Sequence, residues 1–320
     1  YKNIEVKFLN GPKKDQVIIF ESDFPNIKEG QKIYINHNIH SGNSVYAITS
    51  IDRVNSILFF VLLFILAIII FGGWQGFRSV ISLGFSFITI FYVLMPILLK
   101  GYNPILSSFV IASAILFLAI FFTHGFNKES GVAYGGTMIA VLLTSLLAMA
   151  AVKITNLSGF VGDESTYLNM NTGGTLNFSG LLLAGIIVGV LGVLDDIAIT
   201  QASVVTELFN TDKNLTRRQV YVKALRVGKE HVSALVNTLI LAYVGTSLPL
   251  LLLIKTYDYD IQTILNMESI STEIIRAIVG SIGLIMTVPI VTLLAVFYLK
   301  NYKHKNNKLE HSHAHHGHGH

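Results

Sequence analysis

The sequence predicts a mainly α-helical polytopic membrane protein, a bundle of about seven transmembrane helices preceded by a small extracytoplasmic β domain. Three observations predict this fold class. The chain of 320 residues is 52% hydrophobic and only 13% charged, whereas soluble domains are typically about 25% charged. Long apolar runs recur from Val54 onward. The residues before them alternate between apolar and polar side chains, which is typical of β-strands.

The β domain is predicted over residues 1–52. Its alternating runs are IEVKFL, QVIIF, KIYIN and VYAITSI, and the turn sequence NGPKKD separates the first two. Short strands bounded by turn residues indicate a small β-barrel or sandwich.

The transmembrane domain is predicted over residues 53–300, with a basic, His-rich tail over 301–320. A helix needs roughly 20 apolar residues to cross a bilayer. Seven stretches meet this length: 55–74, 79–99, 103–123, 131–153, 179–205, 232–254 and 274–299.

Lys and Arg residues predict the orientation, because they are retained in cytoplasmic loops. They collect after the first, third, fifth and seventh stretches. The opposite side carries the β domain and an acidic loop with Asp258, Asp260, Glu268 and Glu273. The N-terminus is therefore expected outside and the C-terminus in the cytoplasm.

The fifth stretch carries two acids, Asp195 and Asp196, in its second half. Carboxylates within a membrane usually face a protein interior or a hydrated cavity. A 3.6-residue period places one set of small and polar residues on a single face: Gly185, Gly189, Gly192, Asp196, Thr200, Ser203 and Glu207. We interpret the glycines as a helix-packing surface and the acids and hydroxyls as an ion or proton path. Alternatively, the glycines only pack and the acids are inert groups near the interface.

Asp196 is expected to face the bundle interior, where burial disfavours a charged carboxylate and a proton could bind and leave. His231 and Asn237 on the sixth stretch are candidate partners on the same path. They could equally be interhelical hydrogen-bonding groups. In the rival arrangement, Asp196 pairs with a cytoplasmic arginine such as Arg226.

Two further segments carry structural predictions. Gly280 and Gly283 form a small-residue face before Pro289, which indicates tight helix packing and a kink. Residues 215–230 are typical of a basic amphipathic helix on the inner membrane surface. Anionic lipid headgroups are then expected near Arg217, Arg218 and Lys223, although a solvated loop would fit the same sequence. This basic charge lies beside apolar segments, so nucleic acid is not an expected partner.

No enzyme and no cofactor are predicted. The chain has no cysteine, and it contains no HExxH, GxSxG, phosphate-loop or dinucleotide motif. The histidine-rich tail is typical either of a metal-scavenging segment or of an affinity-tag-like addition. Its candidate ligands are His311, His313, His315, His316, His318 and His320.

Several segments resemble the YibE/F family of bacterial multi-pass membrane proteins. They are GLLLAGIIVGVLGVLDDIAITQASVVTEL (180–208), ALRVGKEHVSALVNTLILAYVGTSLPLLLL (224–253), EIIRAIVGSIGLIMTVP (273–289), HGFNKESGVAYGGT (124–137) and YAITSIDR (46–53). The resemblance implies a multi-pass protein of the bacterial cytoplasmic (inner) membrane but no settled activity.

A fainter similarity is to the RND superfamily, in particular the export components SecD and SecF. The stretch GVLDDIAITQASVVTEL is similar to a helix in which a glycine closely precedes an Asn-Asp pair, with Asp196 at the aspartate. The chain lacks the arginine signature after that helix, Glu207 is displaced by about one position, and no large periplasmic domain is present.

Two functions are expected from these observations. The first is a transporter, or an ion- or proton-coupled export component, that uses Asp195 and Asp196. The second is a non-catalytic accessory subunit that binds a protein partner through its β domain. What separates them is whether the two acids face a hydrated interior or a dry contact.

Overall fold

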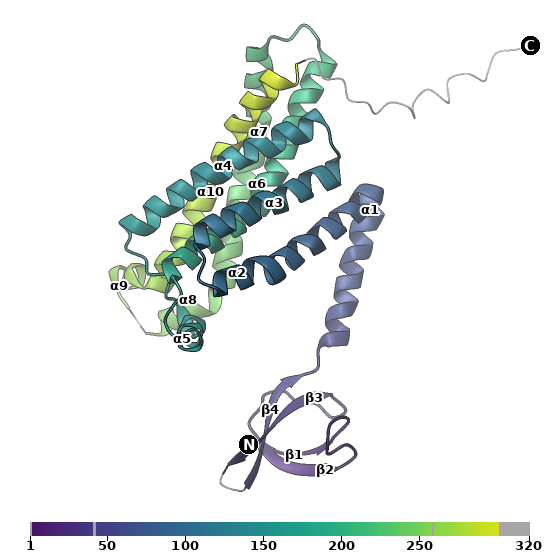
Figure 1. The fold of residues 1–320 in the computed structure, drawn as a ribbon, viewed down its shortest axis with the longest axis vertical. Coiled ribbons are helices and arrows are strands. Elements are labelled where there is room, and N and C mark those ends of the chain that lie inside the picture. Colours follow the sequence, from purple (N-terminus) through teal and green to yellow (C-terminus); the bar gives the residue numbers. More distant parts are fainter. Residues whose placement is uncertain (1, 41–42, 258, 301–320) are drawn as a thin grey trace, which may run out of the picture. The chain divides into compact units, whose positions relative to one another are not determined.

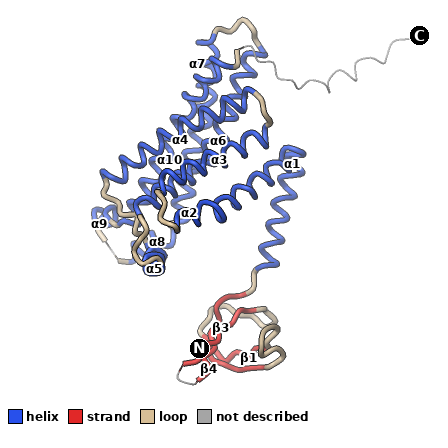
Figure 2. Tube along the Cα trace, viewed as in Figure 1, coloured by secondary structure: helices blue, strands red, loops and turns tan. Residues whose placement is uncertain are grey.

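The computed structural model describes residues 2–40, 43–257 and 259–300 (Figure 1). The chain divides into two compact units, of which the first ends at Gly73 and the second begins at Trp74. The strands belong to the first unit and most helices to the second (Figure 2). The metal-binding prediction for the histidine-rich tail lies outside the described residues.

Four strands make up the N-terminal β region, at the positions the alternating runs predict. They are β1 (Lys2–Lys7), β2 (Val17–Ser22), β3 (Ile33–His40) and β4 (Asn43–Ile51). β1 pairs antiparallel with β2 and β3 pairs antiparallel with β4, with an irregularity between Tyr34 and Ile35. The described strands thus form two two-stranded sheets.

The ring of Tyr46 joins the two hairpins. It stacks on His37 with ring centroids 4.8 Å apart, and Phe8 and Phe20 lie at 6.2 and 6.0 Å. The ammonium group of Lys13 donates a 2.7 Å hydrogen bond to the Tyr46 hydroxyl. Tyr46 is partly buried, so its ring contacts, rather than a fully buried core, connect the two hairpins.

The first helix, α1 (Val54–Thr89), is interrupted at Gly73, where φ is 52° and ψ is −132°. Glycine adopts such a backbone conformation without a Cβ clash, so the interruption falls where the sequence permits it. A π-helical turn, η1 (Ile90–Leu94), and the short α2 (Met95–Leu99) continue the second part.

Four further long helices of the second unit are each candidates for a membrane span: α3 (Pro104–His124), α4 (Lys128–Ile154), α6 (Phe178–Thr211) and α10 (Glu268–Tyr298). Side-chain caps fix where several of them begin. The Asn103 side chain accepts hydrogen bonds from the first turn of α3, and Asn127 and Asn177 do the same for α4 and α6. These caps satisfy amides that have no partner inside the helix.

A bent pair of helices lies between α6 and α10. It consists of α7 (Arg217–Thr246) and α8 (Leu248–Thr256), and the helix direction bends by 57° between them. The bend falls at Ser247, next to Pro249, because a proline cannot continue the hydrogen-bond ladder of the preceding helix. The connecting segments contain α5 (Gly162–Asn171) and α9 (Ile261–Asn266).

Five helical elements of the described chain are long and apolar enough to cross a membrane, or six if the bent pair counts as one span. The sequence predicted seven. The count is lower because Val54–Leu99 is one element of 46 residues, although two spans were predicted there on either side of the break at Gly73. The sixth predicted span, 232–254, corresponds to the bent pair.

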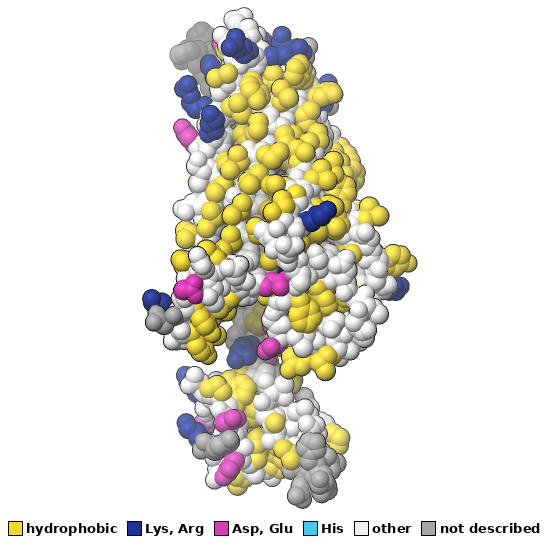
Figure 3. Space-filling model, turned by 90° about the vertical axis from the view of Figure 1, so that its left-hand side faces the viewer, with side chains coloured by type: hydrophobic (Ala, Val, Ile, Leu, Met, Phe, Trp, Pro, Cys, Tyr) yellow, Lys and Arg dark blue, Asp and Glu magenta, His cyan; other side chains and the backbone are white. Residues whose placement is uncertain are grey.

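The core of the second unit lies around α6 and α10, which contact each other and also α4 and α7. Leu116, Leu194 and Leu284, from three helices, are fully buried there. Hydrophobic side chains also cover much of the outer surface, and Lys and Arg gather at one end of the unit (Figure 3). An apolar exterior of this kind is typical of a membrane protein. Pro289 lies inside one continuous helix, and the kink predicted there stays a prediction.

Candidate functional site

The predicted stripe of small and polar residues lies on the outer face of α6. All seven of its members are exposed in the single chain: Gly185, Gly189, Gly192, Asp196, Thr200, Ser203 and Glu207. Asp195 is half-buried. Asp196 is thus exposed in the single chain, and its expected position in the bundle interior stays a prediction.

The opposite face of α6 carries the bulky residues that fill the core, and this determines which side is buried. Ile186, Val190, Leu194 and Val205 are each at most 2% exposed. Burying branched and long apolar side chains removes far more apolar area from water than burying glycines does. The sequence analysis assigned the helix-packing contact to the small residues of α6, whereas the buried face of α6 is the opposite one.

The glycines of the stripe also lack the close contact that was expected. A Cβ at Gly185 or Gly192 would meet no atom within 4 Å, and one at Gly189 would lie 3.6 Å from the Tyr243 hydroxyl. In contrast, a Cβ at Gly283 would collide with Thr144 of α4. One at Gly280 would lie 3.1 Å from Val190. The close helix contacts of this region are made on α10 and not on the α6 stripe.

Asp196 belongs to a group of titratable side chains from four helices. It interacts electrostatically with His124 of α3 and His231 of α7. His124 interacts in addition with Glu129 of α4, and Asp195 with Asp196. These three acids and two histidines come from α3, α4, α6 and α7, and α6 contacts each of the other three helices. The ion pair between Asp196 and Arg226 is not found among the described residues, whose ion pairs join Lys7 to Asp15 and Arg276 to Glu273.

A polar cavity of about 330 Å³ adjoins this group. His124 lies on its wall, and its Nδ1 is 3.3 Å from the Gln75 side-chain amide nitrogen. Ser203 of the α6 stripe lines the cavity as well. The remaining lining residues are Trp74, Arg78, Thr123, Asn127, Glu129, Ser130 and Ile199.

The beginning of α4 places two buried polar side chains on the cavity. The Asn127 side-chain oxygen accepts a 2.8 Å hydrogen bond from the Ser130 amide, and its amide nitrogen donates to the His124 carbonyl. Glu129 is 9% exposed and Ser130 is 0% exposed. The Ser130 hydroxyl has no hydrogen-bond partner. Sequence reasoning missed Glu129 and Ser130, although an Asn followed by a Glu two residues later at a helix start was a visible signal.

The polar residues of α7 lie on its exposed side. His231, Ser233 and Asn237 are all exposed, and the Ser233 hydroxyl donates to the Lys229 carbonyl of its own helix. Of the candidate partners on this helix, His231 is the one that the structure brings near Asp196.

The basic half of α7 is amphipathic, as predicted, but it is continuous with the apolar half. Val220 and Ala224 are fully buried, while Arg218 and Lys223 are exposed. The Arg217 guanidinium lies 5.3 Å from the ring centroid of Phe297 on α10. The segment therefore packs on the bundle and is not a separate helix.

Gln201 is the buried polar residue that sequence reasoning missed. It is 3% exposed, and its amide nitrogen donates to the Ala224 carbonyl at 2.9 Å and to the Thr292 hydroxyl at 2.7 Å. It thereby joins α6, α7 and α10. The signal was available, because Gln201 falls on the same helical face as Leu194 and Val205.

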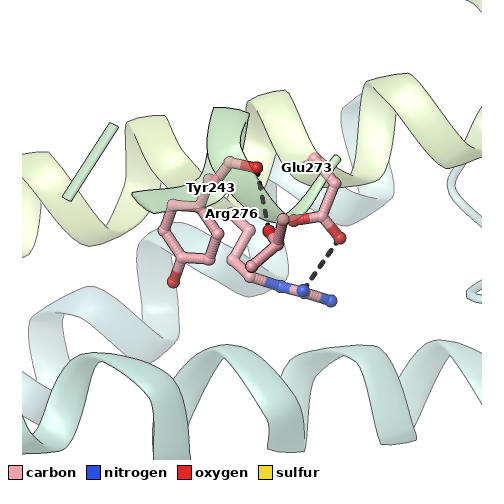
Figure 4. Close-up of polar contacts among 4 residues, drawn as sticks. Tyr243, Glu273 and Arg276 are labelled. Atoms are coloured by element: carbon pink, nitrogen blue, oxygen red, sulfur yellow. Dashed lines mark hydrogen bonds and ion pairs between the residues drawn. The ribbon is translucent and has the colours of Figure 1, made fainter. Parts of the chain in front are cut away.

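A second polar group lies where α7 meets α10 (Figure 4). The Arg276 guanidinium forms a 2.9 Å ion pair with Glu273, and both side chains are about three-quarters buried. Tyr243 interacts electrostatically with both residues. The Nε of Arg276 is buried without a hydrogen-bond partner. The ion pair holds the Arg276 side chain beside Glu273.

No cluster of three or more His, Cys, Asp or Glu side chains that could hold a metal ion is found among the described residues.

A protein-family model described as YibE/F-like protein matches residues 60–301. This range is more than half of the chain and includes every residue of the polar cavity. No curated protein and no solved structure matches the chain. The similarity to the RND superfamily gains no support from these comparisons.

Proposed function

The chain belongs to the YibE/F-like protein family, and on that premise we propose that it is a proton- or cation-coupled transport or export component of the bacterial cytoplasmic membrane. In this proposal Asp196 is the group that binds and releases the ion. His124 and His231 flank it on neighbouring helices. No catalytic reaction is assigned to the chain.

One observation carries the proposal: an aspartate in the middle of a helix long and apolar enough to cross a membrane interacts with two histidines from two other helices. An intramembrane ionisable group is costly and usually functional. Histidine is the side chain whose ordinary titration lies near neutral pH, so the group suits proton exchange.

Reconstitution into liposomes that contain a pH-sensitive dye tests the proposal. Under an imposed proton gradient, the wild-type protein is expected to carry protons faster than protein-free liposomes do. Asp196→Asn should reduce the flux to the protein-free rate, since the amide cannot take up a proton. Glu230→Gln is the matched control, because it removes an exposed carboxylate from α7 and should leave the flux unchanged. Equal flux from wild type and Asp196→Asn, or none from wild type, would contradict the proposal.

The proposal includes seven membrane spans, with residues 54–72 and 74–99 each crossing once and α7 with α8 crossing as a broken span. Support comes from the backbone interruption at Gly73 and from the one-sided distribution of Lys and Arg. The N-terminal β region is then outside and Lys300 inside. Arg217, Arg218 and Lys223 are at the inner surface, where anionic lipid headgroups would contact them.

A non-catalytic accessory role is the second candidate. It is favoured by the outward apolar side chains of β2, because Val17 is 53% and Ile19 is 69% exposed. Exposed apolar residues on a strand are suited to binding a protein partner. Retained proton flux in a variant that lacks residues 1–52 would separate this role from transport.

A further inference from the structure

The polar cavity beside His124 carries two opposite charges that are not paired with each other. Arg78 and Glu129 both line it. Neither forms an ion pair with a described residue, since the pairs found there involve other side chains. The cavity, about 330 Å³ in volume, lies next to both groups.

Arg78 supplies the positive charge. Its guanidinium lies 5.6 Å from the ring centroid of Trp74, and the side chain is half-buried. A guanidinium carries five N–H donors in a planar fork that matches the geometry of a carboxylate. An aromatic ring on one face holds the group in place and leaves these donors available.

Glu129 supplies the negative charge, and its burial makes that charge costly. It is 9% exposed, and its neighbour Ser130 is fully buried with an unpartnered hydroxyl. A buried hydroxyl without a partner is unfavourable. The Ser130 hydroxyl at the cavity is therefore suited to a ligand that supplies a hydrogen-bonding partner.

We propose that this cavity binds a small zwitterion, whose acidic group is held by Arg78 and the Ser130 hydroxyl and whose ammonium group is held by Glu129. A ligand with a single charge would neutralise one of the two protein charges and leave the other unpaired. A zwitterion pairs with both at once. The volume of the cavity is suited to an amino-acid-sized molecule, because pockets for small ligands begin near about 300 Å³.

Other features of the wall fit such a ligand. Gln75, Thr123 and Ser203 add neutral hydrogen-bonding groups. The N-terminus of α4, with its partial positive charge, begins at the cavity and favours an acidic group there. His124 lines the cavity and interacts electrostatically with Asp196.

The inference rests on the proposed function in one respect, since the zwitterion would be the substrate whose movement Asp196 couples to protons. Binding is measured without a gradient, so the two ideas fail separately. Flux without zwitterion binding would overturn this inference alone. Binding without flux would overturn the proposed function alone.

Isothermal titration calorimetry on the purified full-length protein in detergent at neutral pH tests the inference. The ligands are glycine, β-alanine and γ-aminobutyrate, which differ in the separation of their charges, together with acetate and methylamine, which carry one charge each. At least one zwitterion is expected to bind at least about tenfold more tightly than both single-charge ligands. Arg78→Gln and Glu129→Gln should each weaken that binding at least about tenfold.

Lys128→Gln is the control, because Lys128 is exposed and does not line the cavity. It should bind as wild type does. Should a charge variant not fold, Ser130→Ala replaces it, with a smaller loss of affinity expected. The inference is overturned if wild type binds none of the three zwitterions, or binds acetate or methylamine equally well. Unchanged affinity in folded Arg78→Gln and Glu129→Gln proteins would also overturn it.

Discussion

The side-chain amide of Gln201 donates a 2.7 Å hydrogen bond to the hydroxyl of Thr292, and this bond joins α6 to α10. The same amide nitrogen donates to the Ala224 carbonyl of α7. Gly228 makes room for it, since a Cβ there would lie 2.8 Å from the Gln201 side-chain oxygen. One buried side chain thus holds three helices together in an otherwise apolar region.

Replacing Gln201 with Leu should destabilise the protein by about 1–2 kcal/mol, because two buried hydrogen bonds are lost and the Thr292 hydroxyl loses one partner. Thermal unfolding in detergent measures this. Gln262→Leu makes the same chemical change at an exposed position and should have little effect. Equal unfolding temperatures for the two variants would show that the junction contributes nothing to stability.

Glycine-to-alanine substitutions on α6 and on α10 should have different effects on the stability of the protein. Gly283→Ala places a methyl group against Thr144 and is expected to cost about 1–3 kcal/mol, the usual range for overpacking. Gly185→Ala points into open space and should be neutral or slightly stabilising, because alanine is the better helix former. Unfolding temperature and the yield of monodisperse protein give the comparison. A greater loss for Gly185→Ala would mean that the α6 stripe contacts another helix in the membrane.

Low pH should destabilise the first turn of α9, the short helix between the last two predicted spans. Asp260 accepts hydrogen bonds from the Thr263 hydroxyl and from the amides of Thr263 and Gln262, and these hold the pKa of its carboxyl below the usual range. A depressed folded-state pKa stabilises the helix above the unfolded-state value of about 3.9, and this stabilisation is lost as pH falls through the folded-state pKa.

Hydrogen exchange of the peptide covering α9 measures this effect, after correction for the intrinsic pH dependence of exchange. Protection should fall in acid in the wild type. In Asp260→Asn the neutral amide still caps the helix but does not titrate, so protection should not vary over the same pH range. If the protection of α9 fell equally in acid in both proteins, a group other than Asp260 would be responsible.

The seven-span topology predicts that the turn before α3 faces the outside. The native chain has no cysteine, so a single introduced cysteine reports its own position. Asn103→Cys should react with a membrane-impermeant maleimide added to intact cells. Arg218→Cys should react only after the membrane is permeabilised. The reverse pattern would overturn the proposed orientation.

Sequence reasoning could predict the elements because their signals are local. The period-two runs gave the four strands, and the apolar runs gave α3, α4, α6 and α10 to within a few residues at most ends. The break at Gly73 and the bend at Ser247 depend on backbone conformations that the apolar runs do not reveal. Periodicity therefore located the helices but could not fix how many times the chain crosses the membrane.

The candidate site was harder to predict because it depends on which face of a helix is buried. The stripe through Asp196 was correctly identified as one face of α6, but the larger side chains opposite it fill the core. His124 came near Asp196 only through the packing of α3 on α6, which no sequence spacing encodes. Glu129 and Ser130 required the position of α4 as well.

The unbroken course of α7 has a mechanical consequence. From Arg217 to Thr246 it is one rod, and at Gly228 it rests against Val288 of α10, where a Cβ would lie only 2.5 Å from the valine methyl. Further contacts hold this rod against α10 near both of its ends, where Arg217 lies over Phe297 and Tyr243 lies beside Arg276. A displacement of the basic end, by lipid charge or a bound partner, would therefore be transmitted along α7 to α10 and to the Tyr243 end.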